Sequence, residues 1–384
     1  MAPERKLTVV QVLPALESGG VERGTLEVGK YLVDHGHRSI VISAGGRMVE
    51  QLEREGSEHV AWDIGRKSLW TLRIIPRLRR YLRENNVDIL HARSRMPAWI
   101  AYLAWKGMNP KTRPHFVTTV HGPYSVNAYS AVMTKGERVI VISEMIRKYV
   151  LNNYPSTRPE KLCLIYRGVD PNSFPYGHRP SDEWLGRWHA EFPETRGKRL
   201  VTLPARVTRW KGQEDFLELL TKIRDQVPDI HGLVVGEIKS GKEQFLDELK
   251  ALAERLFVAD RVTFTGHRSD LREIMAASSI VFSLSREPEA FGRVTLEALS
   301  MGTPVIGYHH GGVGEQLDAL YPEGSVPIGE IDTACRLAVA WLLKTPTVPE
   351  TQQFTLDQML EATMATYRGL ATIQTEKGKS IASL

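Results

Sequence analysis

The chain has 384 residues, 42% hydrophobic and 25% charged, which are ordinary values for a globular protein with room for about two domains. Its two cysteines, Cys163 and Cys335, form no CxxC or Cys/His cluster, which argues against a disulfide scaffold or a structural zinc site. No signal-peptide-like segment and no apolar run near the ~18 residues of a membrane span is found, so we expect a cytoplasmic protein.

The positive charge is concentrated in one segment. The net charge is +5, but residues 66–113 contain twelve lysines and arginines and only two acidic residues. Helical spacing predicts a basic face formed by Arg73, Arg77 and Arg80. It places Leu72, Ile75, Leu78 and Leu82 on a separate apolar face. A solvated helix face explains this pattern by itself. Peripheral association with an anionic membrane, at the inner face of the plasma membrane, is a further expectation. No nucleic-acid-binding signature is present.

Strand-like and helix-like segments alternate through the first half of the chain, which predicts a parallel sheet. The expected strands are 7–13, 38–43, 87–91, 116–121, 139–143 and 161–166. Gly19 and Gly20 start the first helix and would let a ligand approach the backbone. A simple tight turn explains them equally well, and the dinucleotide motif G-x-G-x-x-G is missing.

Three polar residues follow expected strands of this first half. His121 ends the fourth strand next to Gly122, at the edge where ligands bind in parallel sheets. A lone histidine is more often structural than catalytic. Arg93 and Arg95 follow the third strand and could contact an anionic acceptor, or could simply belong to the basic segment.

The second half repeats the pattern, with expected strands at 199–203, 231–235, 262–267, 279–282 and 303–307. Arg206 and Lys211 lie between the first of these strands and a helix expected from about Gln213. Two cations beside a helix N-terminus suit a diphosphate, although ordinary surface charge is the simpler explanation.

The segment 236–242 matches most of a P-loop, G-x-x-x-x-G-K. The next residue is Glu243, where a P-loop requires a serine or threonine hydroxyl for magnesium. A carboxylate there would face the phosphates, so we reject the hypothesis that the protein is a nucleoside triphosphatase.

The segment 282–315 contains two carboxylates between two strands and two glycine turns. Glu289 is expected just before a helix N-terminus and Glu297 about two turns inside that helix. Free N–H groups at such an N-terminus can bind an anion or a sugar hydroxyl oxygen. Two glutamates without a surrounding motif would most simply be solvated charges on a helix. The flanking glycines and strands favour a binding site instead.

Several motifs together resemble family 4 retaining glycosyltransferases (GT4). The donor signature is E-A-F-G-R-V-T-L-E, followed by A-L-S-M-G-T-P-V-I and G-G-V-G-E. The family's G-R-x-x-x-x-K-G is kept except for Ala205, and Arg167 replaces the usual Asn of I-x-N-G-V-D. The resemblance implies an α/β GT-B fold, two Rossmann-like domains with parallel sheets facing across a cleft.

The resemblance also assigns the parts of the chain. Residues 1–175 would form the acceptor domain and residues 176–354 the donor domain. A helix at about 355–371 would pack back on the first domain, and 372–384 would be a flexible tail. Catalytic roles fall to His121, Glu289, Arg206 and Lys211. The implied donor-binding residues are Gly19, Gly20, Arg206, Lys211, Gly236, Gly266, His267, Glu289, Ala290, Phe291, Gly292, Arg293, Val294 and Glu297.

The implied reaction moves a sugar from a UDP-, GDP- or ADP-sugar to a lipid-linked or saccharide acceptor, as in lipopolysaccharide or cell-surface polysaccharide synthesis. No D-x-D motif is present, and the cations can replace a metal, so neither a metal nor a cofactor is expected. Two alternatives stay open: a UDP-sugar 2-epimerase of the same fold, and a non-catalytic nucleotide-sugar binding protein.

Overall fold

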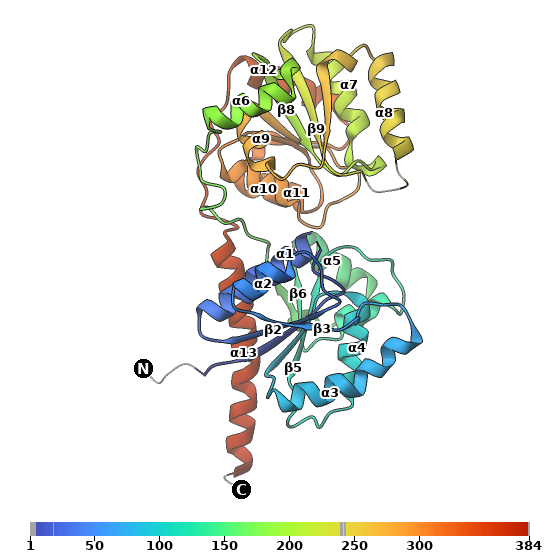
Figure 1. The fold of residues 1–384 in the computed structure, drawn as a ribbon, viewed down its shortest axis with the longest axis vertical. Coiled ribbons are helices and arrows are strands. Elements are labelled where there is room, and N and C mark those ends of the chain that lie inside the picture. The colour runs from blue at the N-terminus through green and yellow to red at the C-terminus, as the bar shows by residue number, and fades with distance from the viewer. Residues whose placement is uncertain (1–4, 18, 239–240, 242, 383–384) are drawn as a thin grey trace. The chain divides into compact units, whose positions relative to one another are not determined.

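The chain folds as two compact units (Figure 1). Unit 1 runs to Tyr166 and resumes at Asp357, and unit 2 comprises Arg167–Leu356. The structure is a computed structural model that describes residues 5–17, 19–238, 241 and 243–382, with side chains as far as Thr372. The chain enters unit 2 earlier than the boundary expected after residue 175.

Unit 1 is built on a parallel sheet of seven strands in the order β3-β2-β1-β4-β5-β6-β7. The strands are β1 (Thr8–Val12), β2 (Arg38–Ser43), β3 (Glu58–Ala61), β4 (Ile89–Ala92), β5 (His115–Val120), β6 (Arg138–Val141) and β7 (Leu162–Leu164). Most residues of the central strands are buried, as in parallel sheets covered by helices on both faces. The sequence did not predict β3, because this short edge strand is half exposed and its EHVA sequence shows no apolar run.

The helices of unit 1 cover its sheet (Figure 1). They are α1 (Gly20–Asp34), α2 (Val49–Arg54), α3 (Ile74–Glu84), α4 (Arg95–Lys106), α5 (Glu144–Asn153) and most of α13 (Leu356–Ala382). The basic face expected on one helix is divided between two elements. Leu72 and Arg73 lie in a short 3-10 helix, η1 (Leu69–Arg73), and α3 starts only at Ile74.

Unit 2 has a parallel sheet of six strands in the order β10-β9-β8-β11-β12-β13. The strands are β8 (Arg199–Pro204), β9 (Ile230–Val235), β10 (Val262–Gly266), β11 (Ile280–Ser283), β12 (Val305–Tyr308) and β13 (Ser325–Val326). Its helices are α6 (Asp182–Glu191), α7 (Gln213–Ile223), α8 (Glu243–Arg255), α9 (Leu271–Ala277), α10 (Arg293–Ser300), α11 (Gly311–Leu320) and α12 (Ile331–Leu343). Two parallel, helix-covered sheets confirm the expected α/β fold.

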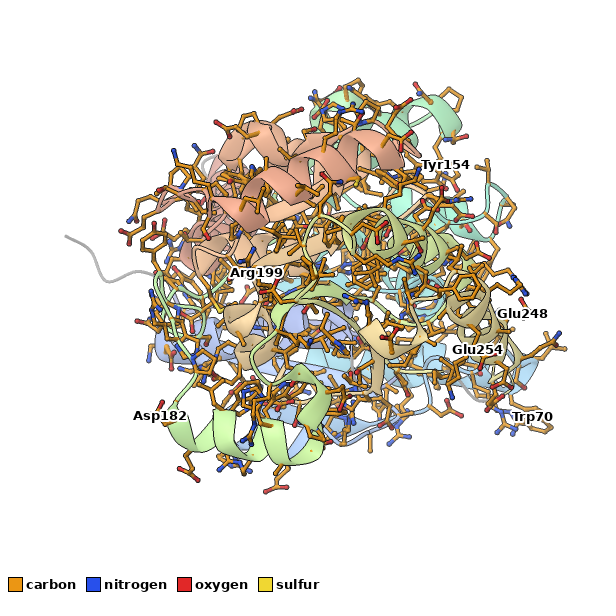
Figure 2. The ribbon with its side chains drawn as sticks, turned by 90° about the horizontal axis from the view of Figure 1, so that it is seen from above. Trp70, Tyr154, Asp182, Arg199, Glu248 and Glu254 are labelled. Carbon is orange, nitrogen blue, oxygen red and sulfur yellow. The ribbon has the colours of Figure 1, made fainter. Side chains whose placement is uncertain are left out.

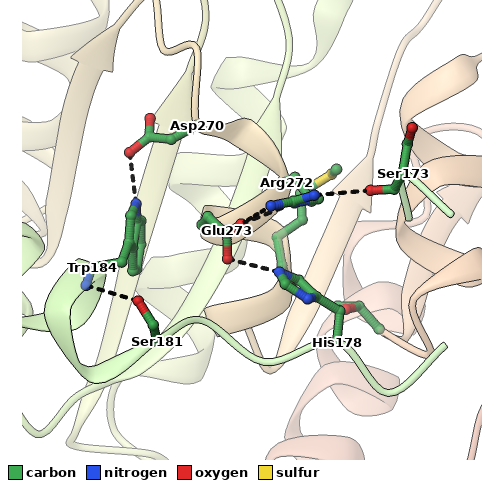
Figure 3. Close-up of polar contacts among 9 residues, drawn as sticks. Ser173, His178, Ser181, Trp184, Asp270, Arg272 and Glu273 are labelled. Atoms are coloured by element: carbon green, nitrogen blue, oxygen red, sulfur yellow. Dashed lines mark hydrogen bonds and ion pairs between the residues drawn. The ribbon is translucent and has the colours of Figure 1, made fainter. Parts of the chain in front are cut away.

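Polar contacts attach the chain after Tyr166 to unit 2, mainly through α9 (Figure 3). His178 Nε2 lies 2.7 Å from Glu273 Oε2, and Arg272 donates to the Ser173 carbonyl at 3.2 Å. Trp184 at the start of α6 donates its Nε1 hydrogen to Asp270 at 2.9 Å. The residues that follow Tyr166 are therefore anchored to the second unit.

The last helix extends beyond its expected end near residue 371. Helix α13 runs from Leu356 to Ala382, so the backbone of the expected tail is helical where the structure describes it. Within unit 1, Tyr367 of α13 is fully buried, and its hydroxyl lies 2.6 Å from His91 Nδ1 on β4. His91 Nε2 in turn lies 2.7 Å from Thr119 Oγ1 on β5. This chain of hydrogen bonds fixes α13 to the sheet of unit 1. No helix of the described residues is long and apolar enough to cross a membrane.

Candidate active site

Unit 2 gathers predicted residues at the carboxyl edge of its sheet. The loop after β8 carries Lys211 and ends at Gly212, whose φ of 76° is left-handed. A Cβ on Gly212 would lie only 2.1 Å from the Leu284 carbonyl oxygen, so a side chain would force the two loops apart. The glycine thus brings the loop after β8 against the end of β11.

This approach joins two predicted residues that are far apart in the sequence. Lys211 Nζ lies 2.7 Å from Glu289 Oε1, and the two side chains are 11% and 21% exposed. The Ser285 hydroxyl donates to the same carboxylate oxygen at 2.5 Å. Lys211 Nζ also lies 4.2 Å from the centre of the Trp210 ring. The cation expected to suit a diphosphate is therefore neutralised by the first carboxylate of the donor signature.

A buried carboxylate braces the loop after β11. Asp215 on α7 is 1% exposed and accepts hydrogen bonds from Arg286, with Nε at 3.1 Å, and from the Tyr308 hydroxyl at 2.7 Å. Burial and this hydrogen bond raise the pKa of Tyr308 far above its usual range. The Arg286 amide donates to the Trp210 carbonyl at 2.7 Å, which links the loop to the one carrying Lys211. Sequence motifs gave no signal for Asp215 or Tyr308.

The glycines of α11 hold the segment around Glu289 from the other side. The Gly312 amide donates to the Glu289 carbonyl at 2.8 Å, and Gln316 donates to the Phe291 carbonyl. A Cβ on Gly312 would lie 2.3 Å from Phe291 Cα, so only glycine allows this contact. The second glycine turn of the sequence signature therefore supports the first one.

Helix α10 starts later than expected. Ala290 and Phe291 are not helical, Gly292 is left-handed with φ of 85°, and the helix begins at Arg293. Glu297 consequently lies about one turn inside the helix, and the prediction of two turns is wrong. Glu297 is 6% exposed, and its Oε1 lies 3.7 Å from Arg293 Nε.

A small pocket opens among these elements. Its volume is about 40 Å³, and its lining includes Lys211, Ser285, Glu289, Gly292 and Val294. A whole nucleotide sugar is much larger than this volume, so a donor bound here would have to extend beyond the pocket.

Three further loops meet at the same edge of unit 2. The Gly236 amide donates to the Gly266 carbonyl at 2.9 Å, and a Cβ on Gly236 would lie 2.0 Å from the Ala205 carbonyl oxygen. His267 is exposed, as is Arg206, for which no ion pair is found among the described residues. The P-loop-like motif includes residues 239, 240 and 242, which lie outside the described part of the chain.

Unit 1 places Gly19 and Gly20 at the start of α1, as predicted. Gly19 has φ of 132°, and a Cβ there would lie 2.8 Å from Glu22 Oε2. Burial raises the pKa of Glu22 above its ordinary value. The carboxylate of Glu22 therefore lies beside the N-terminus of α1.

His121 and Arg95 of unit 1 lie among tyrosines. The His121 amide donates to the Tyr124 hydroxyl at 3.3 Å, and the Arg95 guanidinium lies 4.9 Å from the centre of the Tyr124 ring. It also lies 5.4 Å from the Tyr129 ring and donates to the Ser130 hydroxyl at 3.3 Å. The tyrosines follow His121 closely in the sequence, but that segment has no periodic pattern that would have identified them.

Arg93 does not occupy the position expected of an acceptor contact. It is 1% exposed, its Nε donates to Gln11 Oε1 at 2.6 Å, and burial lowers the pKa of its guanidinium. A side chain enclosed in this way has no surface for an acceptor, so its expected role is corrected to a structural one. Arg93 directly follows β4, which ends at Ala92, whereas Arg95 is the first residue of α4.

The fold and these strand-end loops define a glycosyltransferase of the GT-B class, and the comparisons with known proteins agree. A family model described as Glycosyltransferase Family 4 matches residues 18–173, and one described as Glycosyl transferases group 1 matches residues 186–353. The crystal structure of a glycosyltransferase from Rickettsia africae ESF-5 aligns with a TM-score of 0.84 and 30% identity, covering 96% of this chain and 99% of that one. The chain belongs to the family 4 glycosyltransferases.

Two curated relatives match smaller shares of the chain. An N-acetyl-alpha-D-glucosaminyl L-malate synthase from Bacillus anthracis is 26% identical over 79% of this chain and 78% of its own. A D-inositol 3-phosphate glycosyltransferase from Segniliparus rotundus is 32% identical over 42% of this chain and 35% of its own. The structure of Anabaena HepE in complex with UDP-glucose aligns with a TM-score of 0.73 and 20% identity over 98% of this chain and all of that one, which shows a shared fold.

Proposed function

We propose that this glycosyltransferase moves a sugar from a nucleotide sugar to an acceptor hydroxyl with retention at the anomeric carbon. The observation that carries the proposal is the 2.7 Å contact between Lys211 and Glu289, beside the N-terminus of α10. It brings a cation and a carboxylate of the donor signature to one pocket. A UDP-sugar is the first donor to test, because HepE, which has the same fold, was crystallised with UDP-glucose.

Each group of unit 2 has a part in binding the donor. Lys211 and Arg206 would bind the diphosphate, which takes the place of Glu289 as the partner of Lys211. Glu289, once released, would accept hydrogen bonds from the hydroxyls of the sugar. Glu297 would bind the ribose hydroxyls. The family resemblance also assigns a role toward the transferred sugar to His121 of unit 1.

The chemical step transfers one glycosyl group. The acceptor oxygen bonds to the anomeric carbon on the face from which the diphosphate departs. The bond between that carbon and the phosphate oxygen breaks, and its electron pair goes to the nucleoside diphosphate. The acceptor proton passes to a phosphate oxygen of the leaving group. Fixed cations stabilise the charge that develops on the diphosphate, which is the main contribution we assign to this protein.

The acceptor is proposed to carry an anionic group that Arg95 binds. Malate and inositol 3-phosphate, which occur in the names of two relatives, are both anionic. A lipid-linked or saccharide acceptor with a phosphate or carboxylate has the same chemistry, as in the synthesis of lipopolysaccharide or another cell-surface polysaccharide at the cytoplasmic face of the membrane. Glycosyltransferase relatives and a complete donor signature do not favour an epimerase or a non-catalytic protein.

A direct test uses Glu297→Gln, with Glu287→Gln as the matched control, because Glu287 is exposed in the loop that precedes α10. UDP, GDP and ADP affinities would be measured by calorimetry, and transfer from the preferred sugar donor would be followed by NMR of the anomeric configuration. We expect about tenfold or greater weakening of nucleotide binding in Glu297→Gln, because hydrogen bonds to a charged group are lost. Unchanged affinity would refute the ribose assignment, and an inverted product would refute retention.

Metal independence needs its own experiment. We expect full transferase activity in EDTA, because Arg206 and Lys211 provide the positive charge for the diphosphate. Loss of activity that manganese restores would contradict this expectation. Among the described residues, no group of three or more His, Cys, Asp or Glu side chains is placed to hold a metal ion.

A further inference from the structure

Three large apolar side chains project from η1 in unit 1. Leu69 is 84% exposed, Trp70 is 66% exposed and Leu72 is 43% exposed. Figure 2 shows the labelled Trp70 pointing away from the ribbon. Scattered single apolar residues on a surface are ordinary, but three within four positions form a contiguous apolar ridge.

The ridge is held in a fixed conformation. The Thr71 side chain is buried under it and donates to the Arg66 carbonyl at 2.8 Å, and the Ser68 hydroxyl accepts from the Trp70 amide at 3.3 Å. Helix α3 continues from η1, and its buried Leu78 and Leu82 fix it to the core. The exposure of these side chains therefore follows from the hydrogen bonds and packing that hold η1 in place.

Positive charge surrounds the ridge. Residues 66–83 contain seven arginines and lysines and no acidic residue, and Asp63 and Glu84 are the nearest acidic residues on either side. The exposed cations are Arg66, Lys67, Arg73, Arg77, Arg80 and Arg83. Within the described part of the chain, none of these six forms an ion pair with a carboxylate. The Arg73 guanidinium lies 3.6 Å from the centre of the Trp70 ring, so charge and apolar surface are in direct contact.

We propose that η1 and the exposed face of α3 form a docking surface for a lipid bilayer that contains anionic lipids. Tryptophan and leucine side chains suit the boundary between headgroups and acyl chains, and the arginines suit the negative surface of the leaflet. Charge complementarity favours a membrane, because an acidic protein partner would need many carboxylates around an apolar centre. The surface is distinct from the site around Lys211, so this proposal does not depend on the proposed reaction.

The experiment measures binding of the full chain to vesicles. Sedimentation would compare vesicles of phosphatidylcholine with vesicles containing phosphatidylglycerol, at low and high salt. One variant combines Leu69→Ser, Trp70→Ser and Leu72→Ser, and a second combines Arg73→Gln, Arg77→Gln and Arg80→Gln. The matched controls are Leu343→Ser, an apolar side chain that is 67% exposed in unit 2, and the exposed cations changed together by Arg187→Gln, Arg255→Gln and Arg336→Gln.

We expect binding to the anionic vesicles only, weakened by salt. About fivefold in affinity should be lost per cation removed, or on the order of 100-fold for the triple arginine variant. The apolar variant should also lose at least tenfold, and both controls should bind like the original chain. Brominated lipids should quench a part of the tryptophan fluorescence that disappears in Trp70→Phe. Because the substituted side chains are exposed, thermal unfolding should change little and serves as the folding control.

Three outcomes would overturn the proposal. The first is binding to neither kind of vesicle, which would leave a protein partner as the occupant of the surface. The second is binding that neither triple variant weakens. The third is that the arginine variant loses vesicle binding while the apolar variant does not, and that quenching is unchanged in Trp70→Phe. This result would show that the surface is a basic patch that does not insert into the bilayer.

Discussion

The carboxyl edges of the two sheets handle charge in different ways. In unit 2, Lys211 and Glu289 form a mostly buried ion pair that lines a small pocket. In unit 1, the first cation after β4, Arg93, is enclosed with a neutral partner, Gln11, and the second, Arg95, lies against tyrosine rings. The comparison distinguishes Lys211, which a ligand can still reach, from Arg93, which is enclosed in the folded protein.

The difference follows from solvation. The Lys211–Glu289 pair contributes little net stability, because the desolvation of its two charges offsets much of their attraction, so a diphosphate that supplies a new anionic partner can displace Glu289 from Lys211. An arginine as buried as Arg93 must keep its hydrogen bonds, because an unpaired buried charge is strongly destabilising. A strand-end cation is therefore a candidate for ligand binding only where solvent still reaches it.

The largest expected effect concerns Lys211. Lys211→Met should lower kcat about 100- to 1,000-fold, because a fixed cation that stabilises the departing diphosphate is lost. Steady-state kinetics with the preferred donor would measure it, with Lys222→Met as control, since Lys222 pairs with Asp332 elsewhere in unit 2. A kcat within threefold of the original enzyme would show that the charge of Lys211 is not used.

A second prediction tests the contrast within unit 1. Arg93→Ala should destabilise the protein by about 3 kcal/mol, because it leaves a cavity and a buried Gln11 without its partner. Arg95→Ala should cost less than about 1 kcal/mol and instead raise the KM for the acceptor. Urea unfolding of both variants gives the comparison. Equal losses of stability would mean that the two arginines are not distinguished by burial.

The third prediction is a pH dependence in the buried network of unit 1. Burial raises the pKa of Tyr367 from 10.0 to about 12, so the fold favours the neutral hydroxyl. The stabilisation is complete below pH ~10 and is lost as pH rises towards ~12, because the unfolded chain ionises first. The loss amounts to about 2–3 kcal/mol.

Tyr367→Phe should remove this alkaline loss while costing about 1 kcal/mol at neutral pH, where the hydrogen bond to His91 is missing. Urea unfolding at several pH values between 8 and 11 would show it. Tyr321→Phe in unit 2 should reduce the alkaline loss in the same way, because burial also raises the pKa of Tyr321 to about 12. An unchanged alkaline slope in Tyr367→Phe would exclude a contribution of this tyrosine.

Much of the fold could be predicted because the strands of a parallel sheet are buried on both faces. Runs such as LTVVQVL and SIVF are mainly apolar, and they correspond to β1 and β11. The strands that were not predicted, β3 and β13, are short and lie at sheet edges, where half-exposed residues lack that pattern. The length of α13 was underestimated because its sequence becomes polar after residue 371.

The sequence by itself determined the two-sheet architecture, the donor signature and the basic segment, because each depends on residues close together in the chain. Only the tertiary structure decided that Lys211 pairs with Glu289, that Asp215 braces Arg286 and that Arg93 is enclosed while Arg95 is not. These contacts depend on which strands are neighbours and on where each strand stops. Periodicity does not encode either property, since a pairing across the sheet of unit 2 arises only when β8 and β11 lie side by side.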